Sequence, residues 1–203
     1  VTEYGVALDI KDFNGTVGGN ISGTSDLAPL DQQADMLLEL LPEAQNVGIL
    51  YCSAEANSVY QADVVKAALE AKGVTVTVYT FADSNDVATV TQTACAENDA
   101  LYIPTDNTAA SCTEAINNVA EPAGVPIVAG EEGICKGCGI ATLSIDYYEL
   151  GKTTGKMAAK ILTGESDISE MPIEYYQNPV KKYDAARCEA LGITVPSDYV
   201  AIG

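Results

Sequence analysis

Short apolar runs alternate with helical patterns from residue 47 onward, and this alternation constrains the fold more than any other feature of the sequence. The apolar runs are Val47–Tyr51, Val74–Tyr79, Ala100–Ile103 and Val125–Ala129. Each has the length of a buried strand, and the stretch between two runs is long enough for one helix. Strands and helices that alternate in this way form βα units around a parallel sheet. The sequence therefore predicts an α/β fold.

Local signals predict where some of the intervening helices begin and end. After the first run, Ser58 and Gln61 have the spacing of a capping box, and Gly73 is placed to end the helix. At the front of the chain, several glycines between residues 15 and 23 indicate a flexible or tightly turning stretch. The amphipathic segment 32–41 follows that stretch and leads to the first predicted strand.

The pattern changes after the fourth apolar run. Residues 130–139 are rich in glycine and are predicted to form a loop, and the run 140–145 is extended. A long helix is predicted at about 147–163, with Gly164 at its end. The tail carries three prolines around one short helical stretch at 183–191, so we expect it to wrap the surface or bridge to other structure.

The charge balance excludes one class of partner. The chain has 10 Lys and Arg against 29 Asp and Glu, a formal net charge of -19. Such a chain repels an anionic polymer, so no nucleic acid partner is expected. No run approaches the roughly 20 apolar residues that a membrane-spanning helix needs. The chain begins at Val1 without a Met, which suggests a processed or truncated product.

Three polar segments follow predicted strands and mark the expected binding site. In open parallel sheets, ligands bind outside the carboxyl ends of the strands, where the chain turns into the next helix. That rule selects a segment after each of the first, third and fourth strands. The candidate residues in them are Ser53, Glu55, Asn57 and Ser58, then Thr105, Asp106 and Asn107, and then Gly130 to Gly133 with Glu131.

These side chains suit a zwitterionic ligand. Glu55, Asn57 and Ser58 sit at a predicted helix start, where backbone N–H groups and the helix dipole favour a carboxylate. Asp106 and Glu131 are placed on neighbouring strand ends, where they can accept hydrogen bonds from an ammonium group, and Asn107 can both donate and accept. The alternative is that the amides and hydroxyls only cap helices and that Glu131 is a solvated turn residue.

Enzyme chemistry has little support in the sequence, and no metal or cofactor is expected. The absence of His removes the usual nucleophile systems and metal sites, and no phosphate-binding loop or dinucleotide fingerprint is present. Six cysteines are too few for a disulfide scaffold. Cys135 and Cys138 have the spacing of a redox dithiol or half a zinc site, but a local disulfide or two idle thiols fits a glycine-rich loop better.

Five motifs in order resemble the substrate-binding proteins of ABC transporters in the tryptophan- and tyrosine-binding group. They are GTSDLAP at 23–29, LYCSAEANS at 50–58, YIPTDNT at 102–108, AGEEG at 129–133 and DYYELG at 146–151. The likeness runs from about residue 1 to about residue 195. It implies a type I periplasmic-binding fold, in which two Rossmann-like lobes joined by hinge crossings close on a ligand.

The resemblance also implies a function and a location. Proteins of this group bind an amino acid, often aromatic, deliver it to ABC permease subunits and perform no chemistry. They are exported, and in Gram-positive bacteria they are tethered to the membrane as lipoproteins. By position, seven charged, amide and hydroxyl residues line the cleft from the second lobe. They are Glu55, Asn57, Ser58, Thr105, Asp106, Asn107 and Glu131. Thr2, Asp146 and Tyr147 lie nearer the first lobe or the hinge.

By the same comparison, the chain divides into four segments and its first lobe is incomplete. We expect 1–26 to form part of the first lobe and a hinge crossing, and 27–143 to form a complete second lobe. Residues 144–178 return to the first lobe, and 179–203 form a C-terminal crossing and tail. The leading strands of the first lobe are missing from the sequence, which favours a partner chain, a swapped dimer or a lost segment.

Two other functions remain open at this stage. The same fold can serve as a surface sensor or an adhesion module, with ligand binding secondary or lost. An enzyme that uses Cys135 and Cys138 as a dithiol would need a thiolate of low pKa.

Overall fold

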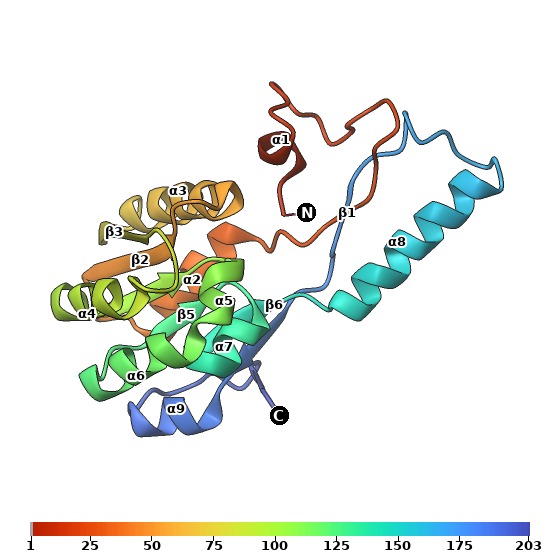
Figure 1. Ribbon diagram of the computed structural model, residues 1–203. Helices are drawn as coiled ribbons and strands as arrows, with labels where there is room; N and C mark the ends of the chain where they lie inside the picture. The colour runs from red at the N-terminus through yellow and green to blue at the C-terminus, as the bar shows by residue number, and fades with distance from the viewer. Residues whose placement is uncertain (1) are drawn as a thin grey trace. The chain divides into compact units, whose positions relative to one another are not determined.

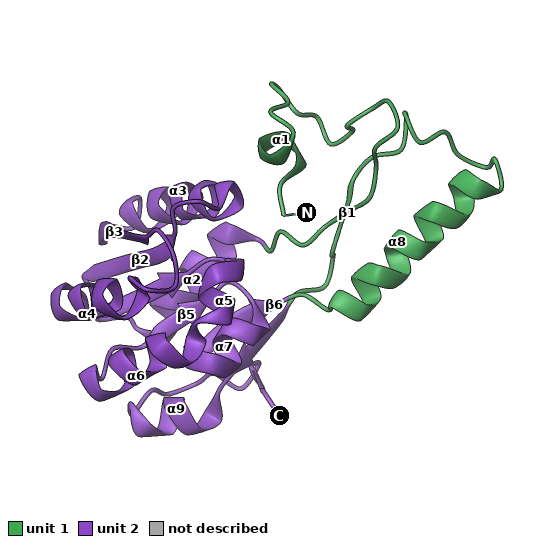
Figure 2. Ribbon diagram, viewed as in Figure 1, with its two compact units in different colours: residues 1–28, 145–179 green, residues 29–144, 180–203 purple. Residues whose placement is uncertain are grey.

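The computed structural model describes residues 2–203, and the chain divides into two compact units (Figure 2). Unit 1 is formed by residues 1–28 and 145–179, and unit 2 by residues 29–144 and 180–203. The chain therefore passes from unit 1 to unit 2, back to unit 1, and again to unit 2. No helix within residues 2–203 is both long enough and apolar enough to cross a membrane.

A mixed sheet forms the centre of unit 2, and its parallel part confirms the predicted α/β fold. From β3 to β6 the strands are parallel, β8 runs antiparallel to β6, and β9 is parallel to β8. In sheet order, they are β3 (Thr75–Phe81), β2 (Asn46–Cys52), β4 (Ala100–Ile103), β5 (Ile127–Ala129), β6 (Ala141–Ser144), β8 (Val180–Tyr183) and β9 (Val200–Ala201).

Helices cover both faces of this sheet (Figure 1). The helices of unit 2 are α2 (Leu30–Leu40), α3 (Ala56–Glu70), α4 (Val87–Glu97), α5 (Asn107–Ser111), α6 (Thr113–Ala123), α7 (Glu132–Cys138) and α9 (Ala185–Ala190). On one face α2 packs against α3, and on the other α6 packs against both α4 and α7. Gly124 ends α6 in the left-handed conformation, with φ of 68°, which glycine adopts without strain.

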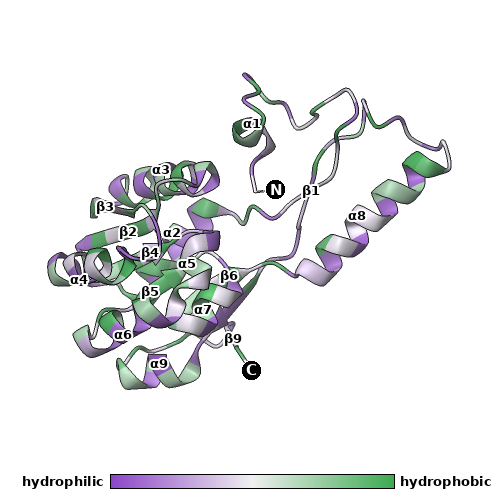
Figure 3. Cartoon of the chain, in the orientation of Figure 1, coloured by the Kyte–Doolittle hydropathy of each residue, from purple (hydrophilic) through white to green (hydrophobic). Residues whose placement is uncertain are grey.

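Strand residues alternate between the two faces, and this alternation builds the core. Leu101 and Ile103 of β4 are buried in one cluster with Ile116 of α6 and Ile134 of α7. Between them, Tyr102 is buried on the opposite side of the strand, because successive side chains point to opposite faces of a sheet. Figure 3 shows hydrophobic colour along the central strands. The strands that lead to these ends are thus packed into a buried core.

Unit 1 is smaller and has little sheet. It contains α1 (Tyr4–Ala7), β1 (Thr24–Ser25), α8 (Tyr147–Leu162) and β7 (Glu174–Tyr175). β1 and β7 pair in parallel, and α8 packs on β1, where the hydroxyls of Thr24 and Thr154 lie 2.7 Å apart. Leu150 of α8 packs in a small apolar cluster with Ala28 and Ile145.

Two local predictions were wrong. Residues 132–138 form α7 and not a loop, because the Glu131 side chain caps the helix start, and Arg187 donates to carbonyls at its end, including that of Gly137 at 2.8 Å. Ser58 and Gln61 do not form a capping box, because α3 begins before them and both side chains bond to the chain after β4.

The tail is also more ordered than its prolines indicated. Residues 180–203 contribute β8, α9 and β9 to unit 2, and β8 continues the sheet beyond β6. The short helix expected at 183–191 is present as α9. Its start is capped by Asp184, whose carboxylate accepts a hydrogen bond from the backbone N–H of Arg187.

Candidate functional site

The three polar segments predicted from the sequence lie at one edge of the unit 2 sheet. β2, β4 and β5 are neighbours and parallel, so their carboxyl ends emerge side by side. Ser53–Ser58 follows β2, Thr105–Asn107 follows β4, and Gly130–Gly133 follows β5. Hydrogen bonds between side chains and backbone connect these segments to one another.

Asp106 is the buried centre of this network, with only 1% of its surface exposed. One carboxylate oxygen accepts hydrogen bonds from the Cys52 backbone N–H and the Ser58 hydroxyl, both at 2.8 Å. The other oxygen caps α5 by accepting from the Ala109 N–H at 2.7 Å. Burial raises the pKa of Asp106, and these hydrogen bonds only partly offset it. Asp106 therefore ties the end of β2 to the end of β4.

Glu55 crosses from the start of α3 to the start of α5. Its carboxylate accepts from the backbone N–H and the side chain of both Asn107 and Thr108, at 2.8 to 3.0 Å. Burial opposes ionisation of Glu55, but these four hydrogen bonds outweigh it and hold its pKa below the ordinary value. Because the Glu55 side chain bonds to the start of α5, it does not cap α3, and the start of α3 has no side-chain cap.

Asn57 and Gln61 hold the segment after β4 from the α3 side. The Asn57 amide donates to the Thr105 carbonyl at 2.9 Å. Gln61 donates to the same carbonyl and accepts from the Thr105 N–H, both at 3.1 Å. The sequence predicts only a helix-capping role for Gln61, because nothing in the neighbouring residues indicates a partner 44 residues away. The Thr105 hydroxyl in turn lies 3.4 Å from the Gly130 carbonyl and can donate to it.

A second buried contact holds the segment after β5 from the side of α2. Gln33 of α2 donates to the Gly130 carbonyl at 3.1 Å and accepts from the Tyr102 hydroxyl at 2.5 Å. Burial raises the pKa of Tyr102 far above its ordinary value, so it remains a donor. Sequence reasoning missed Gln33, although a polar residue among the apolar positions of an amphipathic helix is a signal for such a role.

Glu131 and Ser53 are at the outer part of the edge. The Glu131 carboxylate caps α7 by accepting from the backbone N–H groups of Gly133, at 2.7 Å, and Ile134. Ser53 is exposed, and its hydroxyl donates to the Phe81 carbonyl at 3.3 Å. The carboxylates of Asp106 and Glu131 thus both accept hydrogen bonds from protein donors. An ammonium group at this edge would have to share these carboxylates with those donors.

The other three predicted residues belong to unit 1. Thr2 is buried, and its carbonyl accepts from the Ser25 hydroxyl. Asp146 is exposed and caps α8 by accepting from the Glu149 N–H at 3.0 Å. Tyr147 follows it, 49% exposed, and its hydroxyl lies 3.4 Å from one oxygen of Asp26.

Next to the capping residue of α7, Glu132 forms a compact ion cluster. Its carboxylate lies 2.6 Å from the Lys182 amine and 3.0 Å from the Lys136 amine, and the Ser144 hydroxyl is 3.2 Å away. The hydrogen bond from Lys182 is the main cause that lowers the pKa of Glu132 to about 2, from an ordinary value of 4.5. The cluster joins α7 to β6 and β8.

This low pKa predicts acid sensitivity. The folded chain holds Glu132 ionised at a lower pH than the unfolded chain, so the stabilisation is complete above about pH 4.5 and is lost as pH falls towards 2. We expect Glu132→Gln to remove about 1 to 2 kcal/mol of this pH dependence, since solvent screens part of the interaction. Urea unfolding at pH 2.5 to 6 measures it. Glu114→Gln, at an exposed carboxylate, is the control and should leave the profile unchanged.

Cys135 and Cys138 lie on α7 and are buried, and neither forms a disulfide. Burial raises the pKa of the Cys138 thiol to about 12, and that of Cys135 is raised as well. Such thiols stay protonated near neutral pH, which does not suit dithiol redox chemistry. Within residues 2–203, no cluster of three or more His, Cys, Asp or Glu side chains is arranged to hold a metal ion.

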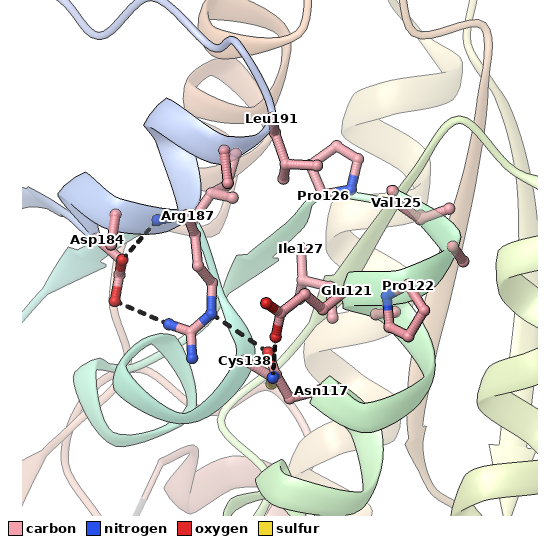
Figure 4. Close-up of a pocket in the computed structure, with 16 residues that line it drawn as sticks. Asn117, Glu121, Pro122, Val125, Pro126, Ile127, Cys138, Asp184, Arg187 and Leu191 are labelled. Carbon is pink, nitrogen blue, oxygen red and sulfur yellow. Dashed lines mark hydrogen bonds and ion pairs between the residues drawn. The ribbon is translucent and has the colours of Figure 1, made fainter.

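A hollow lined by α6 and α9 lies away from these strand ends. This cavity of about 640 Å³ is bordered by Pro126 and Ile127 at the amino end of β5 and by Ile140 just before β6. Figure 4 shows the Arg187 guanidinium beside it, directed towards Asp184 and Asn117. In open parallel sheets, ligands bind at the opposite edge, so we place the candidate site at the carboxyl ends.

Comparison with known proteins agrees with this architecture. Residues 5–201 match the family model of ABC transporter substrate binding proteins. A "Tyrosine-binding protein" from Clostridioides difficile (strain R20291) is 32% identical over 156 residues, which is 77% of this chain and 45% of that protein. The chain thus spans less than half the length of that relative.

Two solved structures are similar over nearly the whole chain. An ABC domain from Streptococcus pneumonia in complex with L-Trp is 28% identical, with a TM-score of 0.88 over 97% of this chain and 66% of that one. A ligand-free, open substrate binding protein with adhesive properties from Clostridium difficile is 31% identical, with a TM-score of 0.77 over 100% of this chain and 70% of that one.

These similarities confirm the type I periplasmic-binding fold that the sequence motifs indicated. The family match extends over almost every element of both units, including the strand ends that form the candidate site. The chain therefore belongs to the family of ABC transporter substrate-binding proteins.

Proposed function

We propose that this protein is the extracytoplasmic binding component of an ABC importer and that it binds an amino acid, most readily an aromatic one. The observation that carries the proposal is the shared edge of β2, β4 and β5, where three polar segments are held together by hydrogen bonds. A site fixed in this way needs little rearrangement to bind a ligand, and this limits the entropy cost of binding. The L-Trp complex and the tyrosine-binding relative support the ligand class.

The start of α3 is the best position for the ligand carboxylate. α5 and α7 begin at the same edge, but the side chains of Asp106 and Glu131 cap them. α3 is longer, at 15 residues, and its start has no side-chain cap because Glu55 turns to Asn107 and Thr108. Backbone N–H groups and the positive end of the helix dipole at such a start favour an anion. Ser53 and Asn57 flank this position in the sequence.

Binding of free amino acids tests the proposal directly. We expect isothermal titration calorimetry of the purified protein with the twenty amino acids to show the tightest binding for L-tryptophan or L-tyrosine. Their amides, which lack the carboxylate charge, should bind at least tenfold more weakly, since the helix start then loses its anion. The absence of binding to every amino acid would contradict the assignment, and equal affinity for acid and amide would contradict the position of the carboxylate.

A second function has one observation in its favour. A solved structure 31% identical to this chain is described as a substrate binding protein with adhesive properties. We therefore propose surface adhesion or sensing as the alternative, in which the same fold contacts a partner without delivering a solute. Growth on a limiting aromatic amino acid separates the two. Loss of the protein should slow uptake of the labelled amino acid if it serves a permease, and leave uptake unchanged if it does not.

Partners and location follow from the leading proposal. An importer component works outside the cytoplasm and docks on permease subunits, and we propose the same for this chain, with a lipid anchor as one means of tethering. Fractionation of the source cells, with and without detergent, would show whether the protein stays with the membrane.

A further inference from the structure

The cavity between α6 and α9 is separate from the candidate site at the strand ends. It belongs to unit 2, because each residue that borders it lies within 117–140 or 184–191. Its volume of about 640 Å³ is within the range of about 300 to 1,000 Å³ that small-molecule sites have. It lies at the amino end of β5, so a ligand there would not occupy the space of one bound at the carboxyl ends.

Apolar side chains form the innermost part of this cavity. Ile127 and Ile140 each have 1% of their surface exposed, and the buried Cys138 also borders the cavity. Val125 and Leu191 border it nearer the surface and are partly exposed. A polar group in the inner part would lose its hydrogen bonds to water without replacement. A ligand of this cavity therefore needs an apolar body.

The guanidinium of Arg187 has no free donor for an anionic ligand. Arg187 is the only Lys or Arg among the described residues that border the cavity. Its Nε donates to the Asn117 side chain, one terminal nitrogen donates to Asp184 at 2.8 Å, and its other N–H groups donate to backbone carbonyls at the end of α7. A guanidinium has five N–H donors, and all of them have acceptors here. The cavity thus offers no partner for a carboxylate or a phosphate.

Negative charge at the outer border of the cavity is left without a cation. Glu121 of α6 is exposed there, and its carboxylate accepts one hydrogen bond, from the Asn117 amide at 2.6 Å (Figure 4). Glu121 forms no salt bridge within the described residues. α6 also ends at this border, at Ala123, and the carboxyl end of a helix has a partial negative charge that favours cations.

We propose that this cavity is a second binding site, for an organic amine with an apolar body. The apolar body contacts Ile127, Ile140 and Leu191, and the ammonium group donates to the Glu121 carboxylate at the end of α6. An anion of the same size finds no donor, and a neutral molecule leaves the charge of Glu121 uncompensated. This site goes beyond the amino-acid binding proposed above and does not depend on it.

Phenylbutylamine and two analogues of the same shape test the site. We expect an NMR titration that follows the backbone amides to give a dissociation constant of about 0.1 to 1 mM for the amine, with shifts at the end of α6 and in α9. Phenylbutanol, which is neutral, and phenylbutyrate, which is anionic, should each bind at least about threefold more weakly. The absence of shifts at α6 and α9, or equal affinity for the three probes, would contradict the proposal.

Glu121→Gln tests the charged part of the site. The substitution keeps the shape and removes the charge, so we expect affinity for phenylbutylamine to fall by about threefold to tenfold and affinity for phenylbutanol to stay the same. Glu114→Gln is the matched control, at an exposed carboxylate of α6 that does not border the cavity, and should leave both affinities unchanged. An equal loss in the two variants would assign the attraction to the net charge of the protein and overturn the site.

Ala190→Phe tests the apolar part. Ala190 borders the cavity from α9 and is exposed, so a phenyl ring can fill the space without disturbing the core. We expect binding of the amine and of the alcohol to be lost. Ala185→Phe, at an exposed position of α9 away from the cavity, is the control and should keep both. The amide spectrum of each variant shows directly whether it is folded. Undiminished binding by a folded Ala190→Phe variant would overturn the proposal.

Discussion

Replacing Asp106 with Ala is expected to destabilise the protein by about 3 to 5 kcal/mol, the largest effect of any single substitution at the candidate site. The change leaves three donors without their acceptor: the backbone N–H groups of Cys52 and Ala109 and the hydroxyl of Ser58. All three hydrogen bonds are buried, so water cannot replace the lost acceptor at full strength. Urea unfolding followed by far-UV circular dichroism would measure the loss.

Two further variants make this prediction specific. Asp106→Asn preserves the shape but turns one acceptor into a donor, which then faces the backbone N–H of either Cys52 or Ala109, so we expect a loss of about 2 kcal/mol or more. Asp146→Ala removes an exposed helix cap with a single hydrogen bond and should cost only about 1 kcal/mol. If Asp106→Ala cost no more than Asp146→Ala, the buried network would not be the element that joins β2 to β4.

Gly130→Ala is expected to cost about 2 to 3 kcal/mol and to weaken amino-acid binding together with stability. A Cβ atom at this position would lie 2.5 Å from the Thr105 nitrogen and 2.7 Å from the Pro104 carbonyl carbon. Both are backbone atoms, so no side-chain rotation relieves the clash, and the segments after β4 and β5 must move apart. The movement also strains the bond from Gln33 to the Gly130 carbonyl.

A glycine without neighbours provides the control. Gly155 lies on the exposed side of α8, and a Cβ there meets nothing within 4 Å. Gly155→Ala should therefore stabilise the protein by about 0.5 to 1 kcal/mol through helix propensity. Thermal unfolding of both variants, with calorimetric titration of the same samples, tests whether stability and affinity fall together only for Gly130→Ala. Normal affinity in that variant would show that the spacing of the two segments does not matter for binding.

The strands of unit 2 could be predicted from the sequence because each is a short apolar run bounded by turn residues. Ala100–Ile103 was predicted with the bounds that β4 has, and the long helix at about 147–163 is α8. α7 was missed because its glycines indicated a loop, and the group that stabilises its end, Arg187, is some 50 residues away in sequence. β8 was missed because its four residues contain two lysines and no alternating apolar pattern.

That the three polar segments share one edge of the sheet could be predicted, but the partners of their side chains could not. Topology alone brings the ends of β2, β4 and β5 together, and this depends on strand order. Whether a carboxylate is free for a ligand depends on which N–H groups happen to point at it. Glu55 bonds to Asn107 and Thr108, more than 50 residues along the chain, so its neighbours in sequence give no sign of this contact.

The return of the chain to unit 2 sets the order in which the sheet of unit 2 can be completed during folding. β8 pairs with β6, with Tyr183 opposite Ala141, although residues 145–179 between them belong to unit 1. Wherever the chain folds, residues 145–179 must therefore be released before β8 can complete the sheet of unit 2. Until residue 180 emerges, β6 presents an unpaired edge that can recruit strands from other nascent chains. Pairing of β8 with β6 then covers this edge.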